Sequence, residues 1–252
     1  VRGGILADKV GYGKTATTIA LLDVDLPRPA PPLPEADQGA FIPARGTLII
    51  VPSNLFEQWL TEISKFLWGG KALRGKLDKG WSPKQCPLRI FAISNVTPLT
   101  KVSAAQLAEA DVVVCSYRLL FSPIYQERRT ELGGSSLAGL VTATRQLIAG
   151  QASVRSGRKG EKYVSSWERL EFPVLEQFHW RRVVFDEFHE LESFDSAQQN
   201  SLQHLRASYR WGLTGTPPVD CSAGVVFMSS LFRVDLPGRL GEALTSNGPG
   251  GC

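Results

Sequence analysis

The sequence lacks several features that would place it in other classes of protein. Its four cysteines, Cys86, Cys115, Cys221 and Cys252, lie far apart and form no CxxC pair, which argues against a zinc knuckle and against a disulfide framework. No apolar run approaches the length needed to cross a bilayer, so we expect no membrane partner. We find no internal repeat. What is present is a mildly basic chain of 252 residues with a net charge of +4, long enough for one α/β domain with a sizeable core. The charge fits a polyanionic partner but does not identify one.

Short apolar strand candidates alternate with helical segments along the chain. The strand candidates cover residues 5–7, 47–52, 88–93, 111–117, 181–186 and 209–213, and the clearest helices cover 15–22, from a cap at Ser53 or Asn54 to about Trp68, and 223–232. This alternation predicts an α/β fold with a mostly parallel sheet and helices on both faces. Residues 26–46 form a proline-rich loop. Residues 121–178 carry no sustained period and are predicted to be a flexible insertion, with at most one helix near 140–148.

The segment "GGILADKVGYGKTATTIALL" (3–22) combines an apolar strand, a glycine-rich turn and a helix start. Gly11 and Gly13 would let backbone N–H groups approach phosphate oxygens, the helix N-terminus favours an anion, Lys14 can reach the terminal phosphates and Thr15 can hold Mg²⁺. Asp8 stands where the strict pattern G-x-x-x-x-G-K-[ST] has its first glycine. The segment therefore predicts a phosphate cradle, with an ordinary strand-to-helix turn as the alternative.

A second segment, "VVFDEFHE" (183–190), places acids at the end of an apolar strand. Asp186 can hold Mg²⁺ through its water shell, and Glu187 can polarise an attacking water. Two surface acids ending a strand are the plainer explanation, but a phosphate cradle elsewhere in the same chain favours nucleotide hydrolysis. We find no NKxD-type element of the kind that reads guanine. Because both segments follow strands of one parallel sheet, we expect Lys14, Asp186 and Glu187 to meet at one edge.

Five segments in order carry a family resemblance: "GGILADKVGYGKT", "TLIIVPSNLFEQWLTEISKF", "DVVVCSYRLL", "WRRVVFDEFHEL" and "YRWGLTGTPP". Together they resemble the first RecA-like lobe of the Swi/Snf-type DNA-dependent ATPases in helicase superfamily two, nearest to the DNA-repair translocases that carry ubiquitin-ligase fingers. The resemblance implies a P-loop NTPase fold over residues 1–252, ATP and Mg²⁺ as cofactors, and a nuclear location. It implies double-stranded DNA, nucleosomes and a second RecA-like lobe as partners.

We expect the chain, which starts at Val1, to be a piece of a longer protein. Without the second lobe and its arginine, we expect it to hydrolyse ATP very slowly.

The resemblance also assigns roles to individual residues. It implies catalytic roles for Lys14, Asp186, Glu187 and His189, nucleotide contacts from Asp8, Gly11, Tyr12, Gly13, Lys14 and Thr15, metal binding by Thr15 and Asp186, DNA contacts from Pro52, Ser53, Asn54, Ser116 and Tyr117, and coupling of ATP state to DNA grip by Thr214, Gly215 and Thr216. Hydroxyls and backbone N–H groups suit a motor that reads no sequence.

Plainer roles remain open for several of these residues. Ser53 could be a helix cap, Tyr117 a core aromatic and His189 a satisfied polar residue. Trp59, Trp180 and Trp211 are expected in the core, and His179 and His204 are expected to be structural.

The chain departs from the family pattern at a few positions. Lys9 replaces an acid, Tyr12 a leucine, Phe188 a small alanine, and Val219 and Asp220 a polar pair. A ring at position 188 could crowd the site or displace His189. Two alternatives stay open. The first is a helicase lobe that separates strands, which the "LTGTPP" turn disfavours. The second is a degenerate lobe that serves as an interaction module.

Overall fold

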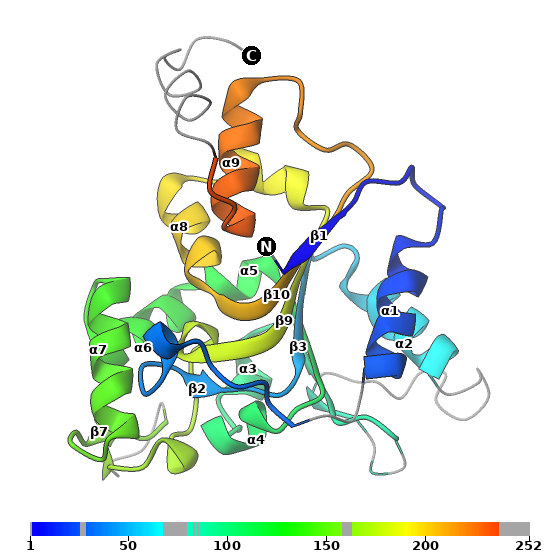
Figure 1. Ribbon diagram of the computed structural model, residues 1–252. Helices are drawn as coiled ribbons and strands as arrows, with labels where there is room; N and C mark the ends of the chain where they lie inside the picture. The colour runs from blue at the N-terminus through cyan, green and yellow to red at the C-terminus, as the bar shows by residue number, and fades with distance from the viewer. Residues whose placement is uncertain are drawn as a thin grey trace.

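A computed structural model describes residues 2–25, 29–67, 80–82, 84, 86–157 and 163–236 of the chain (Figure 1). A mostly parallel sheet lies at its centre, in the order β1-β10-β9-β3-β6-β5-β4, with β2 added beside β9. Only β4 is antiparallel to its neighbour within this described sheet, which confirms the predicted α/β fold. The strands are β1 (Gly3–Leu6), β2 (Ile42–Pro43), β3 (Thr47–Val51), β4 (Gly80–Trp81), β5 (Ile90–Ile93), β6 (Val112–Ser116), β9 (Phe178–Asp186) and β10 (Arg206–Leu213); β7 (Val154–Arg155) and β8 (Tyr163–Val164) form a separate pair.

Helices cover both faces of the sheet. Helices α1 (Lys14–Asp25) and α2 (Phe56–Leu67) lie together on one side, at the right of Figure 1. The other face is covered by α3 (Val96–Leu99), α4 (Ala104–Ala108), α5 (Tyr117–Leu120), α6 (Pro123–Gly133), α7 (Leu137–Ile148), α8 (Ser196–His204) and α9 (Ser222–Phe232). Among the described residues, every helix is too short or too polar to cross a bilayer.

Alternating side chains of the central strands divide the core into two clusters. In β3, Leu48 and Ile50 join the cluster under α4 to α9, whereas Ile49 and Val51 join the cluster under α1 and α2. All five residues of this strand are buried, as expected for a parallel strand covered on both faces. The continuous apolar run "LIIV" therefore contributes side chains to both core clusters.

The prediction of a flexible insertion at 121–178 is wrong for most of its length. Helices α6 and α7 pack so closely that a Cβ on Gly133 would lie 2.2 Å from the Cα of Leu140. The guanidinium of Arg128, 1% exposed, donates to the carbonyls of Phe172 (3.0 Å), Arg155 (2.9 Å) and Glu171 (3.0 Å). These hydrogen bonds hold the main chain at residues 155 and 171–172 against α6. Residues 158–162 of the predicted linker lie outside the described residues.

The described part of the proline-rich loop is anchored to the sheet. A short 3₁₀ turn, η1 (Glu35–Asp37), brings the Asp37 carboxylate 3.0 Å from Nδ1 of His179, and β2 pairs with β9. Burial lowers the pKa of His179, which supports its structural role. Helix α2 begins at Phe56, so the predicted cap at Ser53 or Asn54 is wrong. Trp68 and the glycine-rich tail lie outside the described residues.

The cysteines differ from one another in bonding. Cys86 and Cys115 are free thiols, whereas Cys221 is disulfide-bonded, which the wide spacing of the cysteines did not predict.

Candidate nucleotide site and DNA-facing groove

Strand register brings the ends of three strands together at one rim of the sheet. Leu6, the last residue of β1, lies opposite Leu213, the last residue of β10, and Leu213 lies opposite Asp186, the last residue of β9. The glycine-rich turn, the acidic segment and the threonine turn follow these strands directly. The predicted convergence at the carboxyl edge is therefore what the topology produces.

The glycine-rich turn has the backbone that a phosphate cradle requires. Gly11 and Gly13 adopt φ angles of 89° and 82°, a left-handed conformation that residues with a Cβ rarely adopt. Helix α1 then begins at Lys14, and the N–H groups of a first helical turn have no partner within the helix. The Lys14 ammonium donates to the carbonyl oxygens of Asp8 (2.7 Å) and Lys9 (3.3 Å). Asp8 thus contributes its main chain to the loop even though it replaces the expected glycine.

Asp186 is a buried carboxylate with two internal donors. It is 5% exposed; Nε1–H of Trp59 donates to its Oδ2 at 2.6 Å, and the N–H of Glu187 donates to its Oδ1 at 3.1 Å. Burial raises the pKa of Asp186 to about 6, while the Trp59 bond and the charge of Lys14 act in the opposite direction. The influence of Lys14 on this carboxyl agrees with their meeting at one rim.

The two acids face different surroundings because the chain turns sharply between them. Glu187 adopts φ 45° and ψ 45°, a left-handed conformation that costs a residue with a Cβ about 1–3 kcal/mol. Glu187 is half-buried, whereas Asp186 is almost fully enclosed. The turn therefore gives the second acid access to water that the first does not have.

His189 links the acidic segment to the threonine turn. Its Nδ1 lies 2.8 Å from Oγ1 of Thr214 and 3.3 Å from Oε2 of Glu187. The Thr214 hydroxyl also accepts the N–H of Thr216 at 3.1 Å. A Cβ on Gly215 would lie 3.3 Å from the Val10 side chain, so the threonine turn lies against the glycine-rich turn. The predicted coupling residues are thus in contact with both halves of the nucleotide site.

Phe188 does not crowd the site. Its ring is 0% exposed and packs edge-on against Phe232, with ring centroids 5.2 Å apart. Gly212 makes room for it, because a Cβ there would lie 2.7 Å from the Phe188 ring and 2.4 Å from the Phe232 ring. The expectation that this ring displaces His189 is therefore wrong: it points into the core. Lys9 is exposed, and so is Val219.

A groove of about 950 Å³ runs beside the site. Its lining includes Pro52, Ser53, Asn54 and Tyr117, together with Arg118, Phe121, Ser122, Glu190, Phe194 and Gln198. Ser53 and Asn54 are exposed and follow β3, as the DNA assignment requires. Arg118, an exposed cation, was not predicted, although it follows the quoted Ser-Tyr pair directly.

Two of the residues assigned to DNA are unsuited to direct contact. Ser116 is 2% exposed, and Tyr117 is 4% exposed with its hydroxyl donating to the main-chain oxygen of Asp186 at 2.9 Å. Burial contradicts the expectation that these two side chains face DNA. The alternative of a core aromatic describes Tyr117 better.

The donor set at the rim fits Mg²⁺. Hard cations take oxygen ligands, and Mg²⁺ usually binds through one or two protein groups plus phosphates and waters. Asp186 supplies a carboxylate and Thr15, in the first turn of α1, a hydroxyl. The described residues contain no cluster of three acids, histidines or cysteines that could hold a metal alone.

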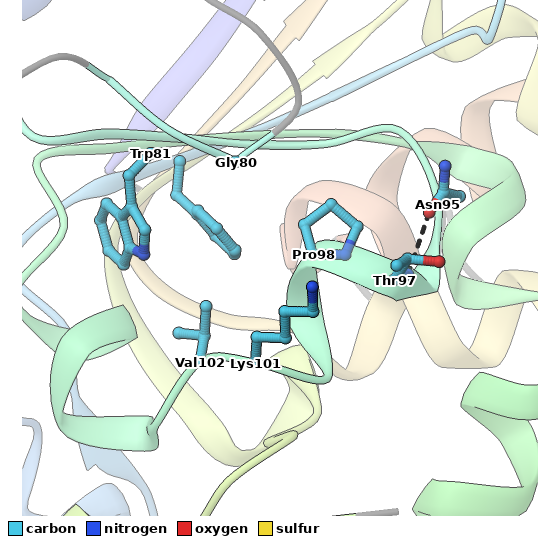
Figure 2. A pocket seen from close by; sticks show the side chains of 8 residues that line it. Gly80, Trp81, Asn95, Thr97, Pro98, Lys101 and Val102 are labelled. Atoms are coloured by element: carbon cyan, nitrogen blue, oxygen red, sulfur yellow. Dashed lines mark hydrogen bonds between the residues drawn. The ribbon is translucent and has the colours of Figure 1, made fainter.

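A second hollow of about 450 Å³ lies at the opposite edge of the sheet, beside β4, β5 and α3 (Figure 2). Trp81, Pro98 and Val102 line it, with Lys101 at its side. Among the described residues that line it, none is a carboxylate that could hold a nucleotide-bound metal.

Comparison with known proteins places the chain among ATPase domains. A family model described as "SNF2-related domain" matches residues 1–242. The chain is 25% identical to "DNA (cytosine-5-)-methyltransferase DMT5" of Cryptococcus neoformans, over 94% of this chain and 13% of that protein. It is 26% identical to "DNA repair protein rad8" of Schizosaccharomyces pombe, over 87% of this chain and 15% of that protein. The chain thus spans less than a fifth of the length of these relatives.

A solved structure shares the fold. The Sulfolobus solfataricus SWI2/SNF2 ATPase core in complex with dsDNA matches with a TM-score of 0.50 and 18% identity, over 91% of this chain and 31% of that one.

Proposed function

The chain belongs to the SNF2-related domain family, and from that premise we propose that it is the ATP-binding and hydrolysing lobe of a double-stranded DNA translocase acting in DNA repair or chromatin remodelling. The observation that carries this proposal is the meeting of Lys14, Asp186 and Glu187 at one rim of the sheet. Relatives named DNA repair proteins support the repair branch and a nuclear location.

Each residue at the rim has a definite task in this proposal. The main chain around Gly11 and Gly13 and the first turn of α1 hold the phosphates, and Lys14 leaves the carbonyls of Asp8 and Lys9 to bind the terminal phosphates. Thr15 and Asp186 would hold Mg²⁺, which when bound would neutralise charge on the phosphates. Glu187 orients the attacking water. Tyr12, 75% exposed beside the cradle, is available to the nucleotide.

The groove beside the site is the proposed DNA contact. Ser53 and Asn54 offer a hydroxyl and an amide at its wall, and Arg118 adds a cation. Such groups bind phosphates without reading sequence. His189 and Thr214 then join the nucleotide site to the threonine turn, so that nucleotide state and DNA grip depend on one another. A second RecA-like lobe would complete both sites, and nucleosomes are a candidate substrate.

Binding of a fluorescent ATP analogue tests the proposal directly. We expect Mg²⁺-dependent binding by the chain and loss of at least about tenfold in affinity in Lys14→Ala, because the lysine neutralises the terminal phosphates. Lys101→Ala is the matched control, since Lys101 is exposed at the opposite edge. Equal, weak binding by wild type and Lys14→Ala would instead favour the interaction module.

Turnover by the chain alone should be very slow, because an arginine from the second lobe contributes about a thousandfold or more. Comparing ATPase stimulation by duplex and by single strands separates a translocase from a strand-separating helicase. Brisk, duplex-stimulated hydrolysis by the 252-residue chain would contradict the expected dependence on a second lobe.

A further inference from the structure

Helix α2 reaches the acidic strand end through the side chain of Trp59. Its indole N–H donates to Oδ2 of Asp186 at 2.6 Å, across 127 positions of sequence. Trp59 is 1% exposed, so water does not compete for this bond. A hydrogen bond to an ionised acceptor is about twice as strong as a neutral one, and more so in a dry environment.

From this geometry we propose that Trp59 is a positioning residue for the metal-holding carboxylate, fixing the rotation of the Asp186 side chain so that its free lone pairs face the phosphate cradle. The inference rests on the proposed Mg²⁺ and ATP binding. It assigns a task in the nucleotide site to a helix whose start follows the DNA-facing residues Ser53 and Asn54.

The surroundings of Asp186 explain why an outside donor is needed. The N–H of Glu187 donates to Oδ1 at 3.1 Å, but it belongs to the adjacent residue and engages only one of the two carboxylate oxygens. Tyr117 donates to the main-chain oxygen of Asp186 and does not reach the carboxylate. Among the described residues, Trp59 is the only side chain that donates a hydrogen bond to this carboxylate.

The same bond holds the carboxylate from the core side, because the Trp59 indole that donates to Oδ2 is 1% exposed. Partners of this kind, which hold a ligand without touching the metal, typically change metal affinity by about 10- to 100-fold when removed. Helical spacing predicts that Trp59 lies in the core, and its burial confirms this. The proposed positioning role is additional to its packing.

The test measures how Mg²⁺ changes the affinity for a fluorescent ATP analogue. In Trp59→Phe, which keeps an aromatic ring but removes the N–H, we expect the Mg²⁺ concentration for half-maximal effect to rise about 10- to 100-fold. Affinity in EDTA should change by less than about twofold, because the phosphate cradle is intact. A general loss of stability would affect both values alike.

Trp180→Phe is the matched control. Trp180 is 0% exposed, its Nε1–H donates to the carbonyl of Leu175 at 3.2 Å, and it lies towards the opposite end of β9. It should show wild-type Mg²⁺ dependence. If Trp59→Phe folds poorly, the analogue 3-benzothienyl-alanine at position 59 replaces the N–H by sulfur at nearly constant shape, and the same shift is expected.

The possible outcomes separate a failure of this inference from a failure of the proposed function on which it rests. Identical Mg²⁺ dependence in wild type and in both position-59 variants would overturn the inference alone, and so would an equal weakening with and without Mg²⁺. A wild-type chain that binds nucleotide no better with Mg²⁺ than in EDTA would overturn the proposed function and this inference with it.

Discussion

Replacing Asp186 by asparagine should stabilise the chain while removing its use of Mg²⁺. Burial raises the pKa of this carboxyl from its ordinary value of 3.8 to about 6, so the charged form is disfavoured in the folded state. The folded state binds the proton on Asp186 more tightly than the unfolded state does. The free-energy cost of keeping this carboxyl ionised in the folded state is therefore absent below pH 3.8. It grows as the pH rises towards 6 and is constant above.

The size of the effect follows from the same shift. At 1.36 kcal/mol for each pKa unit, the free-energy cost of ionising Asp186 in the folded state is about 3 kcal/mol at about pH 7.5 and falls to about half of that at about pH 5.0. The substituted amide would still accept from Trp59 but would present its NH₂ group to the Glu187 N–H, which costs about 1 kcal/mol at either pH. We therefore expect Asp186→Asn to gain about 1–2 kcal/mol at about pH 7.5 and close to nothing at about pH 5.0.

Urea unfolding at the two pH values, followed by tryptophan fluorescence, measures this gain. Asp111 is the matched control, because it is 3% exposed but pairs with Arg45 at 2.9 Å, so Asp111→Asn should lose stability. A destabilised Asp186→Asn at about pH 7.5, or a gain that does not depend on pH, would refute the reasoning.

Three further substitutions test other parts of the structure. Phe188→Ala should lose about 3–5 kcal/mol of stability by urea unfolding, because its ring fills the core beside Gly212; an unchanged midpoint would show that the ring is not packed there. Arg128→Met should lose at least about 3 kcal/mol in the same assay, since three carbonyls lose their donor, and a loss below about 1 kcal/mol would mean that the insertion does not depend on them. Thr214→Val should reduce DNA stimulation of the ATPase, measured in a protein carrying both lobes, by about tenfold while nucleotide affinity stays within about twofold; equal effects on both would contradict a coupling role.

The sequence predicted the sheet and the convergence of its strand ends because those features depend on local patterns. "TLIIVP" marks β3 to within a residue, since a buried strand followed by proline has few alternatives. The glycines at 11 and 13 signal left-handed backbone, and the structure has it. Asp186 at the end of an apolar run signals a strand end, and β9 does end at Asp186.

Other features depend on contacts between distant residues and left no local signal. The segment 121–178 resembles a linker because its order depends on contacts with distant residues, made by buried polar groups such as Arg128 and Glu176 and by buried apolar side chains such as Tyr125 and Phe172. The direction of the Phe188 ring follows from the left-handed turn at Glu187 and from space at Gly212. The bond between Trp59 and Asp186 requires the pairing of β3 with β9 before it can be recognised.

The central claim is that the glycine-rich turn and the acidic strand end form one metal–nucleotide site. A crystal structure of the chain with Mn²⁺ and a non-hydrolysable ATP analogue tests it most directly, because the anomalous signal locates the metal. The account predicts an anomalous peak between Thr15 and Asp186, with the terminal phosphate beside Lys14. A peak elsewhere, or a triphosphate outside the loop from Asp8 to Lys14, would contradict it.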